Sequence, residues 1–121
     1  MRRLLLMLGL LVLASPALAV NFAVDLPQTN ADGTNLDDLA GLKVYTCAAT
    51  PCSKSNGVKT GPDIATPADP PAGAIAQFSL TSGKGFLFVT AFDTSGNEST
   101  ESNVLPFNAV APSPGTLRQV P

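Results

Sequence analysis

The chain has 121 residues, a formal net charge of −2, 45% hydrophobic residues, and neither histidine nor tryptophan. This length suits one domain with a modest core, and the absence of histidine excludes Ser-His-Asp and Cys-His catalytic arrangements. Beyond its first three residues the chain has no basic stripe or cluster, which disfavours binding to nucleic acid or to anionic lipid.

The N-terminal segment is typical of a secretory signal peptide. Two arginines begin it, residues 4–14 form an apolar core, and Ala-Leu-Ala at residues 17–19 provides a small-x-small cleavage site. The alternative, a membrane anchor, needs an apolar run of roughly 18 to 20 residues. We therefore expect cleavage of residues 1–19 and a soluble chain from Val20, secreted or periplasmic, with no membrane contact. Its five basic and nine acidic side chains give a net charge of −4.

Alternating apolar and polar residues predict strands along the mature chain. Phe78 and Leu80 are expected to face inward, and Pro106 marks a sheet edge or a bulge. Residues 53–73 are rich in proline, so we expect at most one short edge strand there, near residues 57–59. The main predicted strands are residues 20–25, 39–46, 74–80, 85–92 and 103–108.

The two cysteines, Cys47 and Cys52, form an even set in a chain that we expect to be exported, and export leads to an oxidising compartment. A disulfide between them would close a short loop and contribute roughly 2 kcal/mol to stability. The alternatives are a metal site, which lacks further nitrogen or sulfur ligands, and a redox pair, which lacks the usual two-residue spacing. We predict the disulfide.

Two stretches of the chain resemble a fibronectin type III module. One is the run Asp-Leu-Ala-Gly-Leu-Lys-Val-Tyr at residues 38–45, and the other is the strand at residues 85–92 with the polar loop that follows it. The resemblance implies an all-β fold, a single immunoglobulin-like antiparallel β-sandwich over residues 20–108. The chain departs from the family at Val24, where relatives carry a core tryptophan, and at Gly85, near which they carry a tyrosine.

Cleavage before Val20 would leave the sandwich with its A strand missing or irregular, so the strand at residues 20–25 would become a sheet edge. Residues 109–121 form a proline-rich tail, in which residues 111–118 look like the linker and A strand of a following module. This tail could fold back, cross to a neighbouring molecule and fill the vacant position, or remain disordered.

No catalytic constellation is visible, so we expect neither enzyme activity nor a cofactor. Calcium is an alternative for the polar loops, with oxygen ligands alternating at Asn30, Asp32, Asn35 and Asp37. No complete calcium-loop motif is present, and turns require the same residue types. We therefore predict no metal site.

The resemblance implies that the BC loop (residues 28–38) and the FG loop (residues 93–99) project from the same pole of the sandwich, as antibody loops do. We predict an exported, bacterial or phage-encoded binding or adhesion module that recognises a protein or carbohydrate ligand there. The alternative is a structural or assembly subunit that pairs through an open sheet edge. The predicted binding residues are Asp32, Asn35, Asp37, Asp38, Ser95, Asn97 and Glu98.

Overall fold

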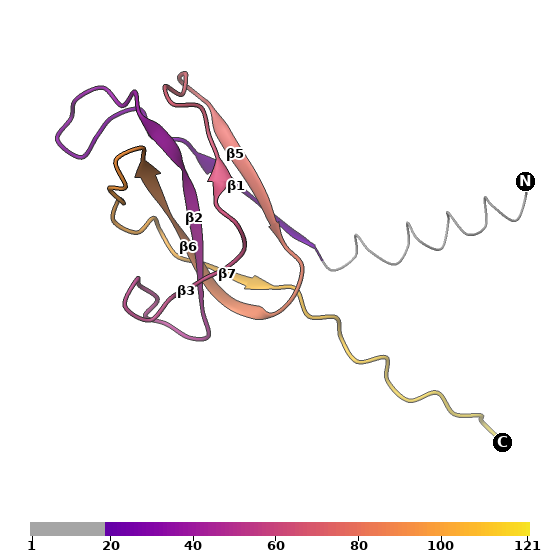
Figure 1. Ribbon diagram of the computed structural model, residues 1–121. Coiled ribbons are helices and arrows are strands. Elements are labelled where there is room, and N and C mark those ends of the chain that lie inside the picture. The colour runs from indigo at the N-terminus through magenta and orange to yellow at the C-terminus, as the bar shows by residue number, and fades with distance from the viewer. Residues whose placement is uncertain (1–18) are drawn as a thin grey trace, which may run out of the picture.

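The computed structural model describes residues 19–121, so the predicted signal peptide lies almost wholly outside the described residues. Within that range the chain is all-β and contains no helix (Figure 1). In this described part, no helix therefore has the length and apolar character needed to span a bilayer. The strands are β1 (Val20–Asp25), β2 (Leu39–Cys47), β3 (Val58–Lys59), β4 (Ile64–Ala65), β5 (Ile75–Leu80), β6 (Lys84–Asp93) and β7 (Leu105–Asn108).

The strands form two antiparallel sheets. One sheet pairs β1 with β5, and the other has the order β3-β2-β6-β7, with β4 also pairing with β2. Between them lies an apolar core of Val44, Leu80 and Leu87, against which Phe22 and Phe78 of the smaller sheet pack. The arrangement is sandwich-like, in agreement with the predicted all-β class.

The four longer strands match their predictions to within one residue at each end. β7 begins two residues later than predicted, at Leu105, and Pro106 lies in this edge strand as expected. β3 is the predicted short edge strand, whereas β4 was not predicted and the expected limit of one short strand is wrong. β4 lies between two prolines and pairs with Gly41 and Leu42. A two-residue strand fits there because neither proline has to donate to the ladder.

The face of the larger sheet that points away from β1 and β5 is covered by the chain itself. A covering loop, residues 48–57, folds over it after β2 and is closed by the Cys47–Cys52 disulfide, with 5.7 Å between the Cα atoms. Phe88 packs against both cysteines and stacks on Tyr45 with ring centres 5.0 Å apart, so that only 1% of it is exposed. The predicted disulfide is confirmed.

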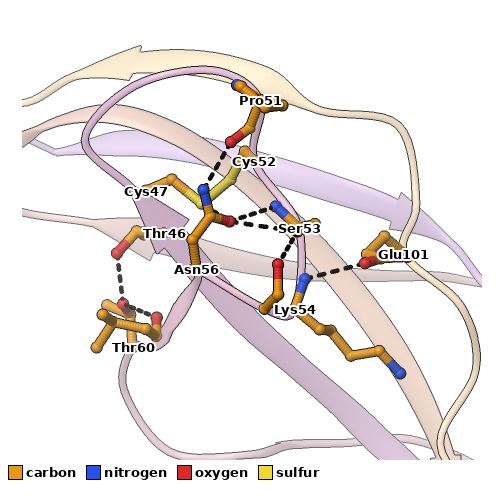
Figure 2. Close-up of a disulfide and its surroundings, with 11 residues drawn as sticks. Thr46, Cys47, Pro51, Cys52, Ser53, Lys54, Asn56, Thr60 and Glu101 are labelled. Atoms are coloured by element: carbon orange, nitrogen blue, oxygen red, sulfur yellow. Dashed lines mark hydrogen bonds between the residues drawn. A yellow bond between two sulfur atoms is a disulfide. The ribbon is translucent and has the colours of Figure 1, made fainter.

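Figure 2 shows how the covering loop is held together. The Asn56 side chain donates to the Pro51 carbonyl at 2.7 Å and accepts from the Ser53 amide at 2.8 Å. Gly57 lies directly on the sheet, since a Cβ atom there would be 3.2 Å from a ring carbon of Phe88. The loop is therefore an ordered cover whose shape depends on its own polar contacts.

The side of the sandwich near β1 is less complete. β1 pairs only with β5, so its other edge has no strand partner among residues 19–121. Phe22 packs on the core but remains partly exposed. From Val110 onward the C-terminal tail is exposed and has no strand, and Figure 1 shows it running away from the sheets. Within one chain, therefore, the tail does not fill the position beside β1.

Candidate binding cleft

The two predicted loops lie at one end of the molecule. The β1–β2 loop (residues 26–38) contains the predicted BC loop, and the β6–β7 loop (residues 94–104) contains most of the predicted FG loop. The Thr94 amide donates to the Asp38 carbonyl at 3.0 Å and so ties the two loops together. Both loops line a cleft of about 390 Å³, which we call the acidic cleft.

The acidic cleft combines an apolar floor with charges of one sign. Its lining includes buried leucines and residues of the core strands, and its charged members are all carboxylates, with no lysine or arginine among them. Such a surface favours a ligand that carries positive charge and some apolar surface. The floor consists of Leu36, Leu39, Leu42, Val89 and Ala91, and the carboxylates are Asp25, Asp93, Glu98 and Glu101.

Asp32 shapes the β1–β2 loop. Its carboxylate accepts hydrogen bonds from the Thr34 hydroxyl at 2.6 Å and the Thr34 amide at 3.0 Å, and these bonds lower the pKa of Asp32. The neighbouring Asn30 side chain donates to the Asn35 carbonyl at 3.1 Å. These contacts make a self-contained turn, so the Asp32 carboxylate is engaged within the loop.

Asp93 has the same function at the start of the β6–β7 loop. Its carboxylate accepts from the Asn97 side chain at 3.0 Å, from the Asn97 amide at 2.9 Å and from the Ser95 amide at 3.0 Å. These bonds, led by that of the Asn97 side chain, hold the pKa of Asp93 below its usual value. Asp93 therefore stays ionised while it fixes the loop.

Glu98 links the β6–β7 loop to the outer face of the larger sheet. Its carboxylate accepts from Thr90 Oγ1 at 2.6 Å and from the Tyr45 hydroxyl at 2.7 Å. Burial opposes its ionisation, but these hydrogen bonds outweigh burial and lower the pKa of Glu98. The hydrogen bond between Tyr45 and Glu98 in turn raises the pKa of Tyr45, and burial and the charge of Glu98 raise it further.

Glu101 joins the same loop to the covering loop. Its carboxylate accepts from the Lys54 amide at 2.9 Å, as Figure 2 shows, and this bond lowers the pKa of Glu101. The Lys54 ammonium donates to the Ser99 carbonyl at 3.0 Å. The wall of the acidic cleft is therefore held by residues of three separate segments.

The predicted binding residues fall into two groups. Asn97 and Glu98 line the acidic cleft, and five others lie outside its lining. The predicted set lacks Asp25, Asp93 and Glu101, which do line the cleft. Asp25 is the last residue of β1, and the strand predicted over residues 20–25 already placed it next to the β1–β2 loop. The five residues outside the lining are Asp32, Asn35, Asp37, Asp38 and Ser95.

The described residues do not support the alternative of a calcium site in these loops. Within residues 19–121, no group of three or more aspartate, glutamate or cysteine side chains is placed to hold a metal ion. The carboxylates of Asp32 and Asp93 are both engaged in turns of their own loops.

No family model, curated protein or solved structure matches the chain. The cleft and its charges therefore carry the functional argument.

Proposed function

We propose that this protein is an exported, non-catalytic binding module with a fibronectin type III-like fold. The strand order supports the fold. Immunoglobulin-like sandwiches keep strands B and E in one sheet and strands C, F and G in the other, which corresponds to β1-β5 and β2-β6-β7. In this correspondence the A strand would lie along the free edge of β1. The two polar loops then have the positions of the BC and FG loops.

The ligand we propose is a cationic segment of a partner protein, bound in the acidic cleft. The observation that carries this proposal is the charge of the lining: its four charged residues are all carboxylates around an apolar floor, although the Lys54 ammonium lies at the rim on the Ser99 carbonyl. The carboxylates attract a lysine or arginine side chain and raise the rate of encounter. The floor can contact the alkyl part of the same side chain.

The hydrogen bonds of the cleft wall prepare it for this ligand. Asp93, Glu98 and Glu101 are each oriented by neighbouring donors, and each has a lowered pKa. They therefore remain charged at neutral and mildly acidic pH. A wall that is already oriented loses less conformational entropy on binding than a mobile one.

A polyhydroxylated glycan is the second candidate. The exposed side chains of Asn35 and Ser95 outside the cleft offer amide and hydroxyl groups of the kind that bind sugars. A neutral glycan makes no use of the charge pattern, so the cationic partner ranks first.

Calorimetric titration with a synthetic peptide of alternating lysine and leucine tests the proposal. We expect binding that weakens with added salt, and a Kd about three- to fivefold higher for Asp25→Asn, which removes one exposed carboxylate of the lining. The matched control is Asp63→Asn, because Asp63 carries the same charge but pairs with Lys43 and Lys59 outside the cleft.

Equal binding of a peptide with glutamine in place of lysine would contradict the cationic ligand, as would an equal effect of the two variants. Binding of a neutral polysaccharide in place of the peptide, lost in Asn35→Ala combined with Ser95→Ala, would assign the pole to a glycan.

A further inference from the structure

The free edge of β1 offers a row of backbone hydrogen-bonding groups. In an antiparallel ladder the hydrogen-bonded pairs recur at every second residue, and the Leu26 amide continues this series by donating to the Ala74 carbonyl. The residues outside the series, Asn21, Ala23 and Asp25, therefore direct their N–H and C=O groups toward the free edge. Such a row is a template for another strand.

A groove of about 360 Å³ lies beside this edge, between the two sheets, and we call it the edge groove. Its apolar walls come from Phe22 and Val24 of β1, Leu87 and Val89 of β6, and Leu105 of β7. It adjoins the acidic cleft, since the two share Val24 and Val89. An added strand along β1 would place every second side chain in this groove.

We infer that residues 115–120 of the C-terminal tail of a second copy of this chain bind there as an added strand. This segment is the proline-free part of the tail, between Pro114 and Pro121, and at six residues it has the length of β1. Its Leu117 is 99% exposed in the tail as it stands. The groove supplies an apolar site for that side chain.

Charge selects which face of the tail points inward. In a strand, Leu117 and Arg118 point to opposite faces, so with Leu117 in the edge groove Arg118 lies on the outer surface. Asp25 is exposed at the end of β1, where it borders both the acidic cleft and the edge groove, and a long side chain of opposite charge on a neighbouring strand can reach it. Arg118 is the only arginine among the described residues.

The position at which the tail starts favours a second copy as the source of the added strand. The Ala109 amide donates to the Gly83 carbonyl in the β5–β6 turn, at the end of the molecule where β1 begins. To run antiparallel to β1, the chain's own tail must enter at Asp25, about 17 Å along the strand and about 10 Å across the sandwich. The straight-line distance is therefore about 20 Å, and the six residue steps from Ala109 to Gly115, which include Pro112 and Pro114, span at most about 20 to 22 Å, so the chain's own tail would reach only when fully stretched. Two copies that exchange tails have no such limit.

Sedimentation equilibrium of the full chain tests the inference, with its N-terminal segment present at expression so that any processing precedes purification. We expect a reversible dimer. Leu117→Gln should raise its Kd about tenfold or more. The matched control, Val120→Gln, should change it by less than about threefold, because that side chain faces outward in the added strand. Arg118→Glu should raise the Kd about fivefold, and Asp25→Lys combined with Arg118→Glu should restore it.

Three results would overturn the inference. A monomer whose melting temperature falls in Leu117→Gln would mean that the chain's own tail fills the groove. A monomer whose melting temperature does not respond would leave the edge unfilled. A dimer that is indifferent to Leu117→Gln and Arg118→Glu would place the contact on another surface.

Discussion

The two sides of the larger sheet are completed in opposite ways. On the outer side the covering loop, the disulfide and the Glu98 carboxylate enclose Phe88 and Thr90, each with 1% exposure. On the inner side, among residues 19–121, the two strands β1 and β5 provide the whole cover, and the edge groove opens beside them. The acidic cleft opens at the rim between the two sides, where Glu98 also belongs to its lining.

This difference suits a division between stability on one side and the proposed recognition on the other. The outer side has its aromatic surface buried and its polar groups paired, so it stabilises the fold. The inner side leaves apolar area accessible, and among residues 19–121 the outer edge of β1 has no strand partner, both of which favour contact with another molecule. If the enclosed side is the more stabilising one, substitutions there should lower the free energy of unfolding more than substitutions on the inner side.

The largest effect should come from Phe88→Ala. It removes a fully buried ring that contacts both cysteines, and should lower the free energy of unfolding by about 3 to 5 kcal/mol. Phe22→Ala, on the partly exposed inner side, should cost about half as much. Chemical denaturation followed by circular dichroism measures both. Equal losses would remove the distinction between the two sides.

The disulfide should contribute next. Replacing Cys47 and Cys52 by Ala frees the covering loop and should cost about 2 kcal/mol by loop entropy. A reducing agent should lower the melting temperature of the unaltered chain to about that of the double variant. It should leave the melting temperature of the double variant unchanged. A response of the double variant to reductant would show that the shift has another cause.

The Glu98 carboxylate should make stability depend on acid. Because its pKa is lowered on folding, its contribution is present above the usual value of 4.5 and is lost as the pH falls through the folded-state pKa. Glu98→Gln should cost at most about 1 kcal/mol at neutral pH and flatten the acid limb. Tyr45→Phe removes one of the two hydroxyl groups that donate to Glu98. Denaturation measured across pH should therefore show a smaller flattening of the acid limb for this variant than for Glu98→Gln. An unaltered acid limb in Glu98→Gln would contradict this role.

Tyr45 offers the smallest and most local readout, because it is the only tyrosine in the chain. Near-ultraviolet titration should give a pKa above the usual value of 10.0, since the phenol donates to Glu98 and lies near its charge. A raised pKa also means that this contribution to stability is lost as the pH rises through it. Glu98→Gln should shift the midpoint back down, and an identical midpoint in both proteins would be inconsistent with the hydrogen bond.

Local patterns predicted the strands because the two-residue period is visible within each segment. They predicted correctly that Phe78 and Leu80 face inward, but they did not assign a face to Phe22 or Phe88. Phe22 and Phe78 lie between the sheets, whereas Phe88 lies on the opposite face under the covering loop. What covers a face depends on where a distant loop folds, and alternation carries no information on that.

The candidate site was predictable only where it is local. Turn formers in the loops led to Asn97 and Glu98, which do line the acidic cleft. The partner of Glu98, Tyr45, is 53 residues away in the sequence. Asp25 lines the cleft because β1 ends there. Glu101 is held there by its hydrogen bond with the Lys54 amide of the covering loop. The composition of the polar loops alone could not identify either residue.

Amide hydrogen exchange of the monomer at low concentration shows whether the outer side is closed and the inner side open. We predict strong protection at Phe88 and Thr90, and fast exchange at Asn21, Ala23 and Asp25 that slows as the protein concentration rises. If these three β1 amides are as protected in the dilute monomer as those of Phe88 and Thr90, the inner side is closed and β1 has no edge open to another strand.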